Sequence, residues 1–371
     1  MILVGEASGD AHAAKFVSHI RQLNPDIFIS GMGTTEMQKA GVEVFLDSSE
    51  IAVMGLIEVL KHWIDIKRAM AIVKQQLDKT RPDLLVLVDY PEFNLKMARH
   101  ARELGIRVLF YISPQVWAWR PRRIHKIGRL IDHMAVIFKF EKAYYERANI
   151  PVSFVGHPLV DKVISSRSPD VVRPQLGLGQ DTTVIGLFPG SRKSEIDRLL
   201  PLMLATARQM SETKQQLQFV LPVAAALDLD AIKRQCDQSQ LNIKVSRDNI
   251  YDLITCCDSI ISCSGTVTLE IALLGVPMCI VYKMSGISYA VISRLVTIPH
   301  IGMVNIVAEK SVVQEFLQND ASVDNVSREM IKIIDDRDYR KRITNDLLTV
   351  RENLGEGGGS AQMARLVLSF L

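Results

Sequence analysis

The stretch Thr183 to Ile196, TVIGLFPGSRKSEI, places the strongest constraint on how this chain can fold. It opens with an apolar run, Val184 to Phe188, which is typical of a strand buried on both faces of a parallel sheet. Pro189 and Gly190 end the strand, and the leucine-rich continuation predicts a helix with Ser191 as its N-cap. A strand, a glycine turn and a helix in succession form the repeating unit of doubly wound α/β domains.

The same turn is suited to bind an anion. Backbone N–H groups at the helix N-terminus and the positive end of the helix dipole point to one place. Arg192 adds a guanidinium group that can hold two phosphate oxygens. We interpret Gly190, Ser191 and Arg192 as the seat of a diphosphate. The alternative is an ordinary strand-to-helix turn with a surface arginine.

Apolar runs alternate with helical segments on both sides of a region rich in Ser, Pro, Arg and Gly that begins near residue 165. A length of 371 residues is typical of two domains. We therefore predict an α/β fold with two doubly wound, Rossmann-like domains, residues 1–165 and 166–344. A tail of about 345–371 is expected to pack back on the first domain or to exchange with another chain. The GxGxxG pattern is absent, so a dinucleotide fingerprint is not supported.

Composition excludes several classes of protein. The net charge is only +3, so no general nucleic-acid footprint is indicated. No run of about 18 uncharged apolar residues exists, and we expect no membrane span. The first residues have neither the basic region nor the cleavage site of a signal peptide. The five cysteines lack zinc-ligand spacing and are expected to be reduced, buried thiols, with no metal or cofactor.

Two polar turns in the first half follow apolar runs. Asp89 comes directly after the strand predicted at Leu84–Val88, at the strand end where open α/β sheets place ligands. Its carboxylate is suited to act as a general base, and the alternative is a helix cap. Glu6, Ser8 and Asp10 occupy the turn after the first predicted strand.

Cations gather beside two tryptophans in the stretch Ser113 to Lys126, and we single out Arg120, Arg122 and Arg123. This combination suits a phosphate group or a lipid surface, and the alternative is a solvated basic helix face. Residues 51–77 carry an amphipathic stripe that we expect to be mostly core. Leu60 and Trp63 could instead form a lipid-facing patch.

A second turn in the C-terminal half follows the apolar strand predicted at 259–262. Ser264, Gly265 and Thr266 can present hydroxyl and N–H groups to phosphate or sugar, and Glu270 can accept both hydroxyls of a ribose. The alternative is a capping box, but Leu269 stands where Thr266 would need a Glu or Gln partner. Asn305 is expected in the cleft between the domains.

Taken together, these motifs resemble those of the lipid-A-disaccharide synthases, inverting glycosyltransferases with the B-type two-domain fold. The resemblance covers nearly the whole chain and rests on GEASGD (5–10), VMGLIEVL (53–60), the Asp89 turn, SPQVWAWR (113–120), GHPLVD (156–161), PGSRKSE (189–195) and SGTVTLE (264–270). Around Asn305 the sequence departs from the family's usual Leu-Pro-Asn run.

The resemblance implies two domains facing across a cleft and transfer of a sugar from UDP-2,3-diacylglucosamine to 2,3-diacylglucosamine 1-phosphate. The products would be a β-1,6-linked disaccharide 1-phosphate and UDP, formed without a metal at the cytoplasmic face of the inner membrane. The resemblance also implies that homodimers exchanging C-terminal segments can form.

The resemblance further assigns roles to single residues. Arg192 and the N–H groups after Gly190 would stabilise the leaving UDP, with donor contacts from Ser191, Ser264, Gly265, Thr266, Glu270 and Asn305. Asp89 would deprotonate the acceptor hydroxyl. Acceptor or lipid-phosphate contacts would come from Glu6, Ser8, Asp10, Arg120, Arg122 and Arg123, and the 51–64 stripe would meet the acyl chains.

Two other functions remain open from the sequence. One is a related B-type enzyme acting on a UDP-amino sugar, either an epimerase or a transferase with a soluble acceptor. The other is a non-catalytic lipid-binding protein of the same fold.

Overall fold

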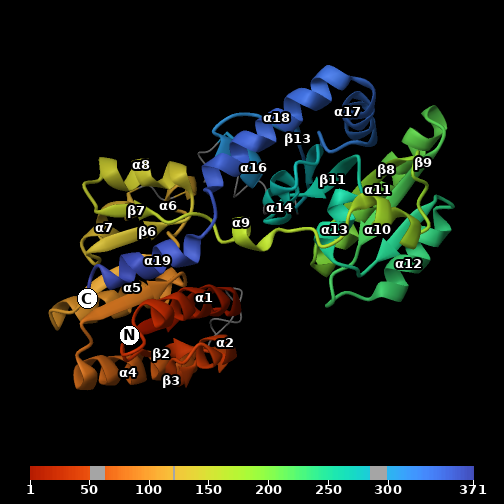
Figure 1. Ribbon diagram of the computed structural model, residues 1–371. Coiled ribbons are helices and arrows are strands. Elements are labelled where there is room, and N and C mark those ends of the chain that lie inside the picture. Colours follow the sequence, from red (N-terminus) through yellow and green to blue (C-terminus); the bar gives the residue numbers. More distant parts are fainter. Residues whose placement is uncertain (51–62, 120–121, 285–298) are drawn as a thin grey trace. The chain divides into compact units, whose positions relative to one another are not determined.

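A computed structural model describes residues 1–50, 63–119, 122–284 and 299–371, and the chain divides into two compact units (Figure 1). Unit 1 comprises Met1–Pro158 and Leu354–Leu371, and unit 2 comprises Leu159–Asn353. Each unit is an α/β domain with its own parallel sheet, which confirms the predicted fold class.

Unit 1 is built on a seven-stranded sheet with the order β3-β2-β1-β4-β5-β6-β7, and every described pair is parallel. The strand order reverses between β1 and β4, which makes the carboxyl ends of these two strands the topological switch point. The strands are β1 Ile2–Val4, β2 Ser30–Gly33, β3 Glu43–Asp47, β4 Leu84–Val88, β5 Arg107–Tyr111, β6 His133–Val136 and β7 Val152–Phe154.

Helices pack on the unit 1 sheet, and its central strand β4 is entirely apolar, with all five residues buried. The helical elements are α1 Ala7–Leu23, α2 Thr35–Lys39, η1 Ser48–Glu50, α4 Trp63–Thr80, α5 Pro91–Glu103, α6 Val116–Trp119, α7 Arg123–Gly128, α8 Lys139–Arg147 and α19 Gly359–Leu368.

Unit 2 has a six-stranded parallel sheet with the order β10-β9-β8-β11-β12-β13, so its switch point lies between β8 and β11. The strands are β8 Thr183–Phe188, β9 Leu217–Pro222, β10 Ile243–Ser246, β11 Ser259–Cys263, β12 Met278–Tyr282 and β13 Glu315–Leu317. The helices are α9 Leu159–Lys162, α10 Pro169–Gln175, α11 Lys193–Thr213, α12 Leu229–Gln238, α13 Ile250–Thr255, α14 Val267–Leu273, α16 Met303–Ala308, α17 Val323–Asp335 and α18 Arg337–Leu354.

The units divide at Pro158, not at the expected residue 165. The reason is that the segment after α9 is bound to unit 2 through the buried carboxylate of Asp252. Its Oδ1 accepts hydrogen bonds from Ser165 Oγ at 2.9 Å and from Ser166 N at 2.8 Å, and its Oδ2 accepts one from Arg167 Nε at 2.8 Å. These bonds make the segment part of unit 2.

The C-terminal crossing also falls later than the expected residue 345. Arg351 and Asn353, in the last turn of α18, donate hydrogen bonds to the carbonyl oxygens of Leu273 and Val307, so α18 is held within unit 2. The chain then returns to unit 1, where α19 packs against α1 (Figure 1).

Two further expectations concern the whole chain. All five cysteines are buried and none forms a disulfide, as predicted. Among the helices of the described segments, none is long and apolar enough to cross a bilayer.

Candidate active site

The turn after β8 is shaped by a contact between Gly190 and Glu195. Gly190 has φ +119°, which L side chains rarely adopt, and a Cβ atom there would lie 2.2 Å from Glu195 Oε2. That oxygen accepts hydrogen bonds from Ser191 N at 2.9 Å and Arg192 N at 3.1 Å. Only glycine therefore lets the carboxylate reach back over the turn.

This contact corrects two expectations. The N-cap of α11 is Arg192, not Ser191, because Glu195 closes a capping box on the Arg192 backbone. The N–H groups of Ser191 and Arg192, expected to face a diphosphate, instead donate to Glu195. The Arg192 side chain remains 71 % exposed, with Nη1 3.6 Å from Glu195 Oε1, and is an accessible cation of the turn.

The turn after β11 and the turn after β8 line one pocket. Ser264, Gly265 and Thr266 line it, and Thr266 makes no side-chain capping bond to α14. Glu270, in the first turn of α14, accepts a hydrogen bond from Tyr251 Oη at 3.2 Å through Oε1. Burial raises the pKa of Glu270. The pocket, here called the unit 2 pocket, has a volume of about 440 Å³ and also contains Gly190, Ser191, Arg192 and Glu195.

Asn305 is not part of this pocket. Its side chain is fully buried, Nδ2 donates to Val313 O and Glu315 Oε1, and Oδ1 accepts from Val312 N and Val313 N. The amide therefore has no remaining hydrogen-bonding capacity for a ligand. Asn305 and Glu315 instead anchor the start of α16, since Glu315 accepts the N–H groups of Ile301 and Gly302.

At the switch point of unit 1, Asp89 follows β4 with φ +48°, and Tyr90 has φ +45°. Tyr90 is the N-cap of α5 and makes no side-chain capping bond, so Asp89 is not the helix cap. Burial and then the nearby carboxylate of Glu6 raise the pKa of Asp89, while a hydrogen bond from the Tyr90 backbone lowers it. A half-buried carboxylate with a raised pKa is a candidate general base.

The turn after β1 is divided between exposed and structural residues. Gly5 is required because a Cβ atom would lie 2.2 Å from the ring of Tyr90. Ser8 is exposed and Glu6 is half-buried beside Asp89. Asp10 is fully buried and accepts hydrogen bonds from Thr34 N, Thr34 Oγ1 and Glu36 N, so it holds the start of α2 and does not face an acceptor.

A second pocket, the unit 1 pocket, lies at the carboxyl ends of β4, β5 and β6 and has a volume of about 490 Å³. Asp89, Ser113, Gln115 and Arg123 line it. Arg123 Nη2 lies 2.7 Å from Glu92 Oε1, so its charge is already partly balanced. Glu6, Ser8 and Asp10 do not line this pocket.

The other expected basic residues lie elsewhere. Arg122 is exposed as the N-cap of α7. Arg120 and most of the 51–64 stripe lie outside the described residues. Of that stripe, Trp63 and Ile64 are exposed, and the ammonium groups of Lys67 and Lys96 lie 5.3 and 5.7 Å from the Trp63 ring centroid.

The sequence did not single out three residues that line the two pockets or contact their lining: Glu195, Glu141 and Tyr251. Glu195 lies three residues after the helix N-cap, a spacing that signals a capping box. Glu141 has the same relation to Phe138; it accepts a hydrogen bond from Trp117 Nε1 at 3.1 Å, and burial raises its pKa to about 8. Tyr251 gave no local signal, because its partner Glu270 is distant in sequence.

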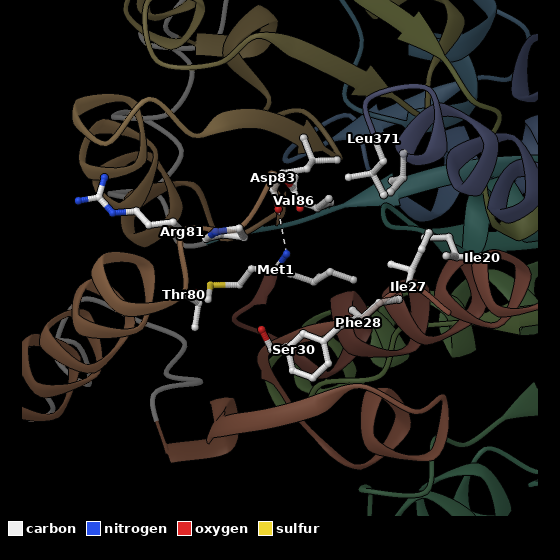
Figure 2. Close-up of a pocket in the computed structure, with 15 residues that line it drawn as sticks. Met1, Ile20, Ile27, Phe28, Ser30, Thr80, Arg81, Asp83, Val86 and Leu371 are labelled. Carbon is white, nitrogen blue, oxygen red and sulfur yellow. Dashed lines mark hydrogen bonds between the residues drawn. The ribbon is translucent and has the colours of Figure 1, made fainter. Parts of the chain in front are cut away.

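A further pocket of about 470 Å³ lies at the opposite, amino-terminal edge of the unit 1 sheet, beside Met1, Phe28, Arg81 and Leu371 (Figure 2). Parallel α/β sheets bind ligands at the carboxyl edge, and none of the predicted site residues lines this pocket. No group of three or more His, Cys, Asp or Glu side chains within the described segments could hold a metal ion.

Comparison with known proteins identifies the family of this chain. Residues 1–366 match the family described as lipid-A-disaccharide synthetase. The chain belongs to this family. The lipid-A-disaccharide synthase of Geobacter sulfurreducens is 48 % identical over 371 residues, which cover 100 % of this chain and 97 % of that protein. The synthase of Nitrosococcus oceani is 41 % identical, with 100 % and 95 % covered.

Solved structures support the same fold. A UDP-GlcNAc 2-epimerase from Neisseria meningitidis bound to UDP-GlcNAc has a TM-score of 0.64 at 13 % identity and covers 99 % of both chains. The calicheamicin glycosyltransferase CalG4 has a TM-score of 0.61 at 14 % identity, covering 100 % of this chain and 98 % of its own. At such identities the likeness shows a shared fold, that of the B-type glycosyltransferases.

Proposed function

We propose that this protein transfers the sugar of UDP-2,3-diacylglucosamine to the 6-hydroxyl of 2,3-diacylglucosamine 1-phosphate. The products are the β-1,6-linked lipid A disaccharide 1-phosphate and UDP. Membership of the lipid-A-disaccharide synthetase family over residues 1–366 supports this reaction. The single structural observation that carries it is the unit 2 pocket, which combines the Arg192 turn with the Glu270 helix at a topological switch point.

The donor is proposed to bind in the unit 2 pocket. Arg192 stabilises the negative charge that grows on the departing diphosphate, because its guanidinium is exposed and it lines the pocket. Ser264, Gly265 and Thr266 face the phosphates or the sugar, and Glu270 accepts the ribose hydroxyls. Gly190 and Ser191 contribute by holding the turn, since Glu195 occupies the N–H groups of Ser191 and Arg192.

Asp89 is proposed as the general base. It takes the proton from the acceptor 6-hydroxyl while that oxygen attacks the anomeric carbon, and the bond from this carbon to the diphosphate oxygen breaks. One displacement of this kind inverts the anomeric configuration. Burial and the nearby Glu6 carboxylate raise the pKa of Asp89, which strengthens its carboxylate as a base.

The acceptor is proposed to bind in unit 1, with Glu6 and Ser8 beside Asp89. Arg122 is proposed to meet its phosphate, because Arg122 is exposed whereas Arg123 lies against Glu92. Exposed Trp63 and Ile64, beside Lys67 and Lys96, suit acyl chains and anionic head groups. We propose a peripheral position on the cytoplasmic face of the inner membrane, and a homodimer formed by exchange of the C-terminal segment.

The proposal is tested by incubating the purified protein with the diacylated donor and acceptor and measuring disaccharide and UDP. Formation of both products in equal amounts is expected. Conversion of UDP-GlcNAc without transfer would indicate an epimerase instead. Lipid binding without UDP release from any donor would indicate a non-catalytic protein.

Asp89→Asn provides the matching test of mechanism. Removing a general base is expected to reduce kcat by about 10²–10⁴-fold, while UDP affinity and melting temperature stay close to wild type. Asp89 would be excluded as the base if kcat stayed at the wild-type level. Asp83→Asn, at an exposed carboxylate before β4, is the control and should change neither value.

A further inference from the structure

We propose that Tyr251 is a positioning residue that fixes the Glu270 carboxylate to receive both ribose hydroxyls, and thereby lets the site distinguish ribose from 2′-deoxyribose. The inference rests on the proposed function, because it assigns part of the same donor pocket. The inference adds Tyr251, which acts through Glu270, and a preference for ribose over 2′-deoxyribose that can be measured separately from the reaction.

Tyr251 contacts Glu270, a residue that lines the unit 2 pocket, through its hydroxyl group. Its neighbour Ile250 lines the pocket, whereas Tyr251 does not and is 8 % exposed. Its backbone N–H donates to Asn249 Oδ1 at 2.9 Å, which fixes the residue at the start of α13. From this anchored and buried residue, Oη donates to Glu270 Oε1 at 3.2 Å.

The hydrogen bond from Tyr251 leaves the Glu270 carboxylate able to accept hydrogen bonds from two further donors. Burial, and then the charge of Glu270, raise the pKa of Tyr251 to about 12, so the phenol stays protonated and serves as a hydrogen-bond donor. An ionised carboxylate has acceptor sites only, on two oxygens. Tyr251 engages one site on Oε1, and within the described segments Oε2 accepts no hydrogen bond.

A pair of neighbouring hydroxyls matches this arrangement. The 2′- and 3′-hydroxyls of a ribose can each donate to one oxygen of a carboxylate held in a fixed plane. A 2′-deoxyribose leaves one acceptor site of this partly buried carboxylate unfilled, and sites built to bind a hydroxyl discriminate strongly against analogues that lack it. Without the phenol, the carboxylate can rotate, and the penalty for a missing hydroxyl becomes smaller.

The test uses the full chain and titration calorimetry with UDP and with 2′-deoxy-UDP. We expect wild type to bind UDP about 10- to 100-fold more tightly than 2′-deoxy-UDP. Tyr251→Phe keeps the ring and removes only the hydroxyl. It should weaken UDP binding by about 3- to 10-fold and reduce the preference for UDP at least threefold. With the full reaction, the donor KM should rise while kcat changes little.

Tyr339→Phe is the matched control. Tyr339 Oη donates to Glu329 Oε1 at 2.6 Å in the same unit, and neither residue lines the unit 2 pocket. This substitution removes the same kind of bond at a remote place and should leave the preference for UDP unchanged.

Glu270→Gln is the second variant, and it provides the background in which the effect of Tyr251→Phe is measured again. Because Tyr251 acts through Glu270, adding Tyr251→Phe to Glu270→Gln should reduce the preference no further. An unchanged preference in Tyr251→Phe, or independent effects in the double variant, would overturn the inference while leaving the donor site intact. Failure of wild type to bind UDP would instead overturn the donor site itself, and this inference with it.

Discussion

Replacing Gly190 by Ala tests how the turn after β8 is held. The new Cβ atom would lie 2.2 Å from Glu195 Oε2 and 2.8 Å from Glu195 Cβ, far inside van der Waals contact. The Glu195 side chain must then leave, and its hydrogen bonds from Ser191 N and Arg192 N are lost. Arg192, at the N-cap of α11, moves with the turn.

The size of the effect follows from two contributions. A non-glycine residue at φ +119° costs about 1–3 kcal/mol of backbone strain. Two lost hydrogen bonds add about 1 kcal/mol each. We therefore expect Gly190→Ala to lower the free energy of unfolding by about 3–5 kcal/mol. In a unit of this size each kcal/mol lowers Tm by about 2–4 °C.

Scanning calorimetry measures the stability, and UDP titration with steady-state kinetics measures the site. Gly275→Ala is the control, because Gly275 has φ +72° in the same unit but no heavy atom within 4 Å of the added Cβ. It should show the strain alone, about 1–3 kcal/mol, with normal UDP affinity and turnover. Gly190→Ala should also lose at least tenfold in kcat/KM for the donor, since electrostatic stabilisation depends on the placement of Arg192.

A Glu195→Ala background separates the backbone strain at residue 190 from the steric collision with the Glu195 side chain. In that background the Oε2 and Cδ atoms that lie nearest the added Cβ are gone, while the Cβ atom of residue 195 stays at 2.8 Å, so the further cost of Gly190→Ala should fall toward the level of Gly275→Ala. Equal stability losses for Gly190→Ala and Gly275→Ala in the wild-type background would refute the reasoning, because they would show that Glu195 does not hold the turn.

Two other predictions concern stability and metals. Burial alone would raise the pKa of Asp252, but hydrogen bonds from Arg167, Ser165 and Ser166 lower it overall. The ionised carboxylate therefore stabilises the folded state at pH values above its unfolded pKa of about 3.9. This stabilisation is lost progressively as the pH falls below that value. Asp252→Asn should therefore lower the free energy of unfolding by about 3–5 kcal/mol in urea at pH 7 and by clearly less near pH 3; a difference independent of pH would contradict this account. EDTA should leave the rate of UDP release unchanged, and a loss restored by Mg²⁺ would show that transfer requires a metal.

The sequence by itself determined the two-domain α/β architecture and the placement of the main turns. Apolar runs such as 84–88 and 184–188 are local patterns, and the residue that follows each of them lies at the carboxyl edge of a parallel sheet. For this reason the sequence was enough to place Asp89, Arg192 and Glu270 beside pockets. The same local patterns carried the family resemblance.

Only the tertiary structure decided which polar side chains already form hydrogen bonds within the protein. Asp10 and Asn305 have the residue types of a ligand site, yet both are buried and satisfied by backbone groups of other segments. Tyr251 and Glu270 are 19 residues apart and belong to different helices. Hydrogen bonds between separate segments depend on how helices pack on the sheet, and no periodicity within one segment records that packing.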